Sequence, residues 1–169
     1  LNAKRQAAMP AVIKVLLIAK NAGISHGLAA SLEYRREACM CKDKILDLVG
    51  VPFKDGGRDL SGLDCWGLVR EIYSRFGYDF PVYEISCYDN VNVTQEMETN
   101  REFWQKHEYP NVPIPCVVAF KVSSPMVNHV GVYIGDGQFI HTRELTGAVI
   151  ERLDSPMWRH RTEGFYSPC

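Results

Sequence analysis

The sequence has no excess of positive charge and no long uninterrupted hydrophobic run. Its 19 Lys and Arg residues are balanced by 20 Asp and Glu, which gives a formal net charge of −1. Composition therefore provides no basic field of the kind that attracts nucleic acid. The most apolar stretch, Ala11–Ala19, contains Lys14 and is shorter than the ~20 residues that cross a bilayer. We expect no nucleic-acid partner and no membrane span.

The same apolar stretch is a doubtful signal peptide, because no clean cleavage site follows it. An amphipathic docking helix is an equal alternative. The codons of Arg35-Arg36 could also form a ribosome-binding sequence, in which case translation would start at Met40. On this hypothesis residues 1–39 are an extension of uncertain status, which the fold and catalysis do not need, and residues 40–169 form the domain.

The chain also lacks repeats, low-complexity tracts and a recognisable disulfide or metal pattern. Its 169 residues are enough to build a core without disulfides. The motif Cys39-x-Cys41 is neither a CxxC redox motif nor a usual zinc knuckle. We expect all the cysteines except Cys65 to be buried or idle thiols. The six are Cys39, Cys41, Cys65, Cys87, Cys116 and Cys169.

Helical periodicity dominates the first part of the domain and β-rich runs dominate the last. Apolar residues from Leu68 to Phe76 recur on one helical face, and Gly77 is a typical C-cap. Runs rich in β-branched and aromatic residues then alternate with turn signals. Helices followed by an antiparallel meander define an α+β domain. The predicted helices cover residues 43–49, 65–76 and 94–106, and the predicted strands cover 116–120, 129–134, 138–142, 148–153 and 163–166.

Cys65 lies where the second of these helices begins, directly after Asp64. An aspartate there can accept a free backbone N–H as N-cap. The helix N-terminus favours thiolate over thiol, and its N–H groups could hold an oxyanion. A nucleophilic cysteine also needs a base, and His129 and His141 fall on consecutive predicted strands. Each feature alone is more often structural, so the combination carries the hypothesis.

The register of the predicted hairpin decides whether the two histidines can touch. A two-residue turn at Asp136-Gly137 would place His141 on the face opposite to His129. A three-residue turn that includes Gly135 would pair His141 with Gly131 and set it diagonal to His129, roughly 7–8 Å away. We predict the three-residue turn, with the two imidazoles hydrogen-bonded or nearly so and both facing Cys65.

Two segments resemble the NlpC-type cysteine peptidases: GVPFKDGGRDLSGLDCWGLV, residues 50–69, and NHVGVYIGDGQFIHT, residues 128–142. The resemblance implies a papain-like fold and an enzyme that cuts peptidoglycan stem peptides without a metal or cofactor. It implies Cys65 as nucleophile, His129 as general base and His141 as the residue that orients the base.

The resemblance also implies residues that contact the substrate. Asp64 matches a position that binds the substrate amine in some members of the family. The position after the cysteine is often serine in the cell-wall members and is Trp66 here. The preceding loop usually carries tyrosine, whereas this chain has Phe53 and Asp55. We expect all four to contribute to substrate binding, and Trp66 to line the cleft rather than the core.

The tail of the chain, residues 149–168, resembles the phage-tail branch of the same family. That branch accompanies tail-tip assembly and cell-wall penetration, so the resemblance implies phage tail proteins as partners. The corresponding location is the virion tail, or the bacterial cytoplasm before assembly, with action at the cell wall.

The leading hypothesis is therefore a cysteine peptidase that cleaves stem peptides, with the bond after D-glutamate as the expected target. One alternative is a structural or assembly protein of the tail that keeps the fold without needing the activity. Another is a zinc site built from Cys65, His129, His141 and Cys116, although these spacings match no compact zinc motif. An acyltransferase or amidase would use the same cysteine–histidine chemistry.

Overall fold

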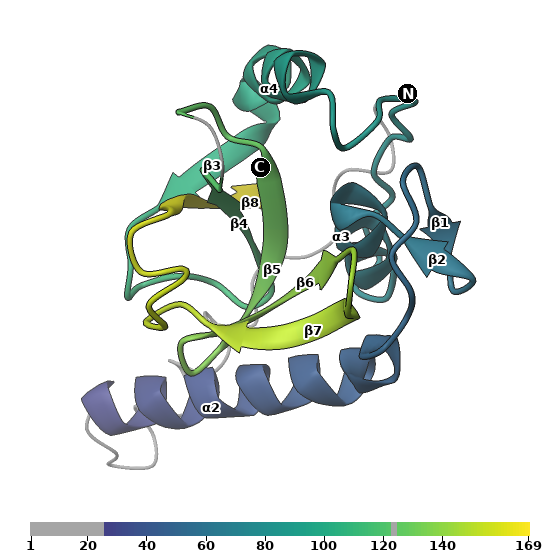
Figure 1. Cartoon of the computed structure of the whole chain (residues 1–169). Helices are drawn as coiled ribbons and strands as arrows, with labels where there is room; N and C mark the ends of the chain where they lie inside the picture. The colour runs from purple at the N-terminus through teal and green to yellow at the C-terminus, as the bar shows by residue number, and fades with distance from the viewer. Residues whose placement is uncertain (1–25, 123–124) are drawn as a thin grey trace. The chain divides into compact units, whose positions relative to one another are not determined.

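The computed structural model describes residues 26–122 and 125–169 (Figure 1). The expected signal peptide or docking helix at Ala11–Ala19 lies outside these residues. Contacts divide the chain into two units, Leu1–Arg36 and Glu37–Cys169. The second unit begins near the domain start that we predicted at Met40, and whether the preceding residues are dispensable stays a prediction. No helix within the described residues is both long and apolar enough to cross a membrane.

The second unit starts within helix α2 (His26–Ile45), which continues into the short 3-10 helix η1 (Leu46–Leu48). The helix predicted over residues 43–49 is thus the end of a longer one. Cys41, Ile45 and Leu48 are completely buried in the core of this unit.

The second unit contains a six-stranded antiparallel sheet (Figure 1). Four consecutive strands make the expected meander, and β8 returns to pair with β4, so that the spatial order is β3-β8-β4-β5-β6-β7. This confirms the α+β class and the predicted strands. Their bounds are β3 Trp104–His107, β4 Cys116–Phe120, β5 His129–Gly135, β6 Gln138–Arg143, β7 Gly147–Arg152 and β8 Thr162–Pro168.

Helix α3 (Cys65–Ser74) packs against β5 and β6, as Figure 1 shows. Its buried residues Leu68, Val69 and Ile72 have no exposed surface and follow the predicted helical face. Because alternate strand residues point to opposite faces, the sheet supports two hydrophobic clusters. One cluster lies against α3, and the other surrounds Phe139 and Trp158.

Two segments differ from the sequence-based expectation. The helix predicted over residues 94–106 begins and ends earlier, as α4 (Asn90–Thr99), and is followed by the 3-10 helix η2 (Arg101–Phe103). Trp104–His107 is strand β3, because it pairs with β8. The polar pattern of this stretch suited a helix, and only the strand partner decides otherwise. In the glycine-rich loop, β1 (Arg58–Asp59) and β2 (Gly62–Leu63) form a small hairpin that we did not predict.

Candidate active site

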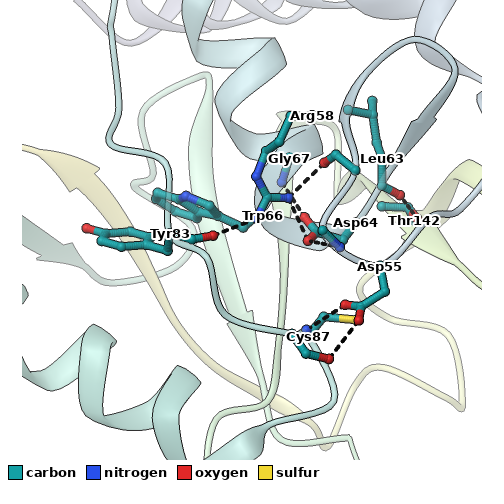
Figure 2. A network of polar contacts seen from close by, with 12 residues as sticks. Asp55, Arg58, Leu63, Asp64, Trp66, Gly67, Tyr83, Cys87 and Thr142 are labelled. Carbon is teal, nitrogen blue, oxygen red and sulfur yellow. Dashed lines mark hydrogen bonds and ion pairs between the residues drawn. The ribbon is translucent and has the colours of Figure 1, made fainter.

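The N-terminus of α3 is organised around the side chain of Asp64, as predicted for its N-cap. Asp64 Oδ1 accepts a hydrogen bond from the Gly67 amide at 2.6 Å. Its Oδ2 accepts from the Gly56 amide at 3.1 Å and pairs with the Arg58 guanidinium at 2.6 Å. Figure 2 shows these contacts converging on the carboxylate. Asp64 is 1% exposed, so the contacts that the structure shows for it are internal ones. Its expected role in binding a substrate amine stays a prediction.

This arrangement requires glycine at position 67. A Cβ atom there would lie 2.1 Å from the carbonyl oxygen of Gly57, a separation that no side chain can adopt. The close approach lets the glycine-rich loop reach the first turn of α3, which in turn brings Arg58 to Asp64. The local sequence Asp64-Cys65-Trp66-Gly67 therefore positions the cysteine by capping the helix and by admitting the loop.

Cys65 does not have the low pKa that its position at a helix N-terminus suggested. Burial raises the pKa of its thiol to about 11, and the neighbouring Asp64 carboxylate adds to the rise. Hydrogen bonding from the backbone amides of Val130 and Trp66 lowers the pKa, but does not compensate. The helix N-terminus favours the thiolate, as expected, but burial and the neighbouring Asp64 carboxylate outweigh this effect on the pKa of Cys65.

The β5–β6 hairpin has the predicted register but not the predicted turn. Asp136 and Gly137 form a two-residue turn between the paired residues Gly135 and Gln138, and both have positive φ (56° and 71°). This is the type I′ geometry that matches the strand twist. An irregularity between Tyr133 and Gly135 shifts the register by one residue, so that Val132 pairs with Ile140.

Continuing this register places His141 opposite Gly131, diagonal to His129, as predicted. The Nε2 atom of His129 and the Nδ1 atom of His141 are 2.9 Å apart, which confirms the expected contact. A Cβ atom on Gly131 would lie 3.1 Å from that of His141, so glycine leaves room for the second ring. The irregularity in β5 thus produces the register that we attributed to a three-residue turn.

Both histidines are held in their neutral forms. Burial lowers the pKa of His129 to about 3, and the neighbouring His141 and Arg143 add to the effect. Burial and the Arg143 guanidinium lower the pKa of His141 to about 3 as well. Neutral imidazole is the form that can accept a proton from a thiol.

Sequence reasoning missed the residues on the far side of His141. Its Nε2 atom lies 3.1 Å from Oε2 of Glu151, on β7. The indole N–H of Trp158 donates to the same oxygen, and Arg143 donates to the other oxygen at 3.2 Å. Trp158 also stacks on the ring of His129, with centroids 5.8 Å apart. A glutamate on the strand next to a histidine, at a diagonal register position, was the signal that could have identified Glu151.

Cys65 and His129 line two cavities. One, of about 380 Å³, extends beneath α4 and is lined mainly by apolar side chains, among them Trp66 and Trp104. The other, of about 350 Å³, contains His141, Trp158 and Phe53. Residues 80–89, which we call the cover segment, line both cavities: Tyr83, Ile85 and Cys87 line the first, and Cys87 and Tyr88 line the second. The cysteine is therefore accessible from both cavities.

The predicted substrate-binding residues largely hold this cover segment. Asp55 accepts hydrogen bonds from the hydroxyl of Ser86 and the amide of Cys87, both at 2.8 Å. Trp66 lines the larger cavity, as expected, and its indole N–H donates to the carbonyl of Pro81 at 3.1 Å. Figure 2 shows Asp55 directed at Cys87, and Arg58 bonded to the carbonyl of Tyr83. Whether these residues also contact a substrate stays a prediction.

The structure provides no support for the zinc alternative. Within residues 26–122 and 125–169, no three His, Cys, Asp or Glu side chains are grouped so that they could hold a metal ion. Cys116 pairs with Tyr133, whereas the strand neighbour of His129 is Phe120. Four residues along a strand correspond to about 13 Å, so Cys116 and His129 cannot share an ion. All six cysteines are free thiols.

A cysteine at a helix N-terminus beside an antiparallel sheet that carries the histidines defines a papain-like α+β domain. The profile of the NlpC/P60 family matches residues 50–167. The chain belongs to this family.

Relatives and solved structures agree with this assignment. The chain is 28% identical over 120 residues to the murein DD-endopeptidase MepS/murein LD-carboxypeptidase of Escherichia coli K12, which covers 70% of this chain and 56% of that protein. It thus spans little more than half of that relative. A lipoprotein-like NLP/P60 protein from Staphylococcus aureus superimposes with a TM-score of 0.59 at 20% identity, over 79% of this chain and 41% of that one. RipD from Mycobacterium tuberculosis, described as a non-catalytic NlpC/p60 domain protein adapted to peptidoglycan binding, has a TM-score of 0.53 at 15% identity, over 76% and 94%.

Proposed function

We propose that this protein is a cysteine peptidase that hydrolyses peptidoglycan stem peptides. The observation that carries the proposal is the contact between His129 and His141 at 2.9 Å, with His129 and Cys65 lining the same two cavities. Cys65 as nucleophile, His129 as base and His141 as the residue that orients the base would supply what covalent hydrolysis requires. Relatives named as murein or peptidoglycan endopeptidases support the substrate class.

The chemistry follows from the protonation states of the site. His129 takes the proton of the Cys65 thiol while sulfur forms a bond to the peptide carbonyl carbon, because both groups start neutral. The backbone N–H groups at the start of α3 can stabilise the resulting oxyanion. The carbon–nitrogen bond breaks as His129 returns the proton to the leaving amine. Water, deprotonated by His129, then attacks the thioester and releases the acid and the thiol.

The two cavities, which share Cys65 and His129, provide room for substrate residues beyond the reacting carbonyl. We propose the bond after D-glutamate in the stem peptide as the target. The tail residues 149–168 suggest in addition that the chain acts in a phage tail during cell-wall penetration. In that case it should sediment with tail particles in fractionated lysates, and its recovery only in particle-free fractions would contradict the assignment to tails.

The experiment for the activity is incubation of the purified protein with defined muropeptides, followed by mass analysis of the products. We expect one peptide bond to be cleaved, and Cys65→Ala to abolish cleavage while the circular dichroism spectrum stays unchanged. Wild-type rates in the Cys65→Ala protein would show that another group is the nucleophile.

A second candidate function is peptidoglycan binding without catalysis, as described for RipD. The raised pKa of Cys65 and the hydrogen bonds that hold Cys87 beside the same two cavities favour this alternative. It predicts that muropeptides bind to the wild-type protein and to Cys65→Ala with equal affinity and that neither protein cleaves them.

A further inference from the structure

Three neighbouring strands carry polar side chains that form one continuous line. His129 is on β5, His141 on β6 and Glu151 on β7. The register pairs His141 with Val149, so that Glu151 is diagonal to His141 just as His141 is diagonal to His129. The atoms along this line are separated by 2.9 Å and 3.1 Å, which are hydrogen-bond distances.

The donors around Glu151 determine the direction of each bond in this line. The indole N–H of Trp158 and the guanidinium of Arg143 can only donate, so both carboxylate oxygens act as acceptors. His141 must then donate its Nε2 proton to Glu151, which leaves its Nδ1 atom without a proton. His129 therefore donates from Nε2 to His141, and its own Nδ1 atom keeps the free electron pair that a base needs.

The surroundings of Glu151 are fixed in the same way. Trp158 is 2% exposed and packs edge-on against the ring of His141, with centroids 4.9 Å apart. Its indole thus restricts the movement of both Glu151 and the ring of His141. Arg143 pairs with the other oxygen and so offsets part of the negative charge of Glu151. The main contribution of Glu151 is therefore an acceptor oxygen held in a fixed position beside Nε2 of His141.

We propose that Glu151 is a positioning residue of the catalytic site, which fixes the tautomers of His141 and His129 and so makes Nδ1 of His129 the base. The inference rests on the proposed peptidase function for its consequence in catalysis, but the tautomers themselves can be measured without a substrate. Glu151 touches neither the thiol nor the substrate, and no proton is transferred to it. It acts through His141, and Trp158 and Arg143 keep it in place.

The first test is the alkylation rate of Cys65 by iodoacetamide, measured by peptide-resolved mass spectrometry because five other thiols are present. Loss of the acceptor lets His141 and His129 take either tautomer and turn. We expect Glu151→Ala to slow alkylation of Cys65 by about 10-fold, a small part of the ~10²–10⁴-fold that a general base contributes. The matched control is Asp154→Asn, which removes a nearby carboxylate that pairs with Arg152. Cys65 should be alkylated in this variant at the wild-type rate.

The second test is the tautomeric state, read from the nitrogen chemical shifts of the histidine rings. Wild type should show His141 protonated only at Nε2. Glu151→Gln keeps the shape of the side chain, so it should fold even where alanine does not. Its amide can donate as well as accept, and we therefore expect a mixture of both His141 tautomers. A single unchanged tautomer in Glu151→Gln, or wild-type alkylation in a folded Glu151→Ala protein, would overturn the proposal.

Muropeptide hydrolysis separates this inference from the proposed function. If both the peptidase function and the positioning role are correct, Glu151→Ala lowers kcat by about the same factor as it lowers the alkylation rate, and leaves KM unchanged. If wild type cleaves no muropeptide but the tautomers and alkylation respond as expected, the peptidase function fails and the positioning role remains. If wild type cleaves and Glu151→Ala cleaves equally well, the positioning role fails alone.

Discussion

Replacement of Asp64 tests whether this carboxylate is mainly structural or mainly a substrate contact. Both of its oxygens are engaged inside the protein, by the amides of Gly67 and Gly56 and by the guanidinium of Arg58. In Asp64→Ala the helix loses its N-cap, which costs about 1 kcal/mol. The mutation also removes the carboxylate that pairs with the Arg58 side chain, which is 19% exposed. Removing one partner of a buried pair costs about 3–5 kcal/mol, and the partial exposure of Arg58 places the cost at the lower end.

We therefore expect Asp64→Ala to lower the free energy of unfolding by about 3–5 kcal/mol in total. This is a large part of the ~5–15 kcal/mol by which domains are stable. Asp64→Asn keeps the cap, because asparagine serves at this position as well as aspartate does. It loses the ion pair with Arg58 and the acceptor of the Gly56 amide. We therefore expect a loss of about 3 kcal/mol, smaller than that of Asp64→Ala because the cap is kept.

The measurement is urea denaturation followed by circular dichroism, with Asp89→Ala as the matched control. Asp89 caps α4 by accepting from the Asn92 amide at 3.1 Å, but it has no buried cation beside it. Its loss should cost about 1 kcal/mol. If Asp64→Ala is no less stable than Asp89→Ala and raises KM for muropeptides, Asp64 is a substrate contact and the structural interpretation is wrong.

Three further predictions concern the histidines, the cover segment and the start of the domain. The pKa of His129 and of His141 is about 3 in the folded protein and ~6.5 in the unfolded chain. The unfolded chain therefore binds more protons between these values, and stability should fall as the pH drops from 6.5 to 5, by about 1–2 kcal/mol per histidine. Denaturation of wild type and His141→Gln at both pH values checks this, and equal pH dependence would contradict it. Asp55→Ala should free the cover segment at Cys87 and speed its amide hydrogen exchange several-fold, whereas unchanged protection would show that other contacts hold it. A chain that begins at Met40 should remain folded and active, and insolubility of that protein would show that the preceding residues are needed.

Local chemistry made part of this protein predictable from its sequence. Helix α3 could be located because Asp64 caps it and its apolar residues repeat with helical spacing. The strands of the meander could be located because β-branched runs alternate with glycine turns. The contact between His129 and His141 also followed, since side-chain alternation and a glycine opposite the second ring leave few registers.

Contacts between distant residues decided the rest. The stretch Trp104–His107 becomes a strand only because the C-terminal strand supplies its partner. The raised pKa of Cys65 depends on desolvation, which the other elements impose on a helix start that would otherwise favour thiolate. Glu151 reaches His141 because β6 and β7 pair in the register that sets His141 opposite Val149, and that register is visible only in the folded sheet. The sequence by itself determined which residues can do chemistry and where the regular elements lie, because propensity and periodicity act over short distances. Only the tertiary structure decided which groups meet and how buried they are, because burial and partnership are properties of the packed chain.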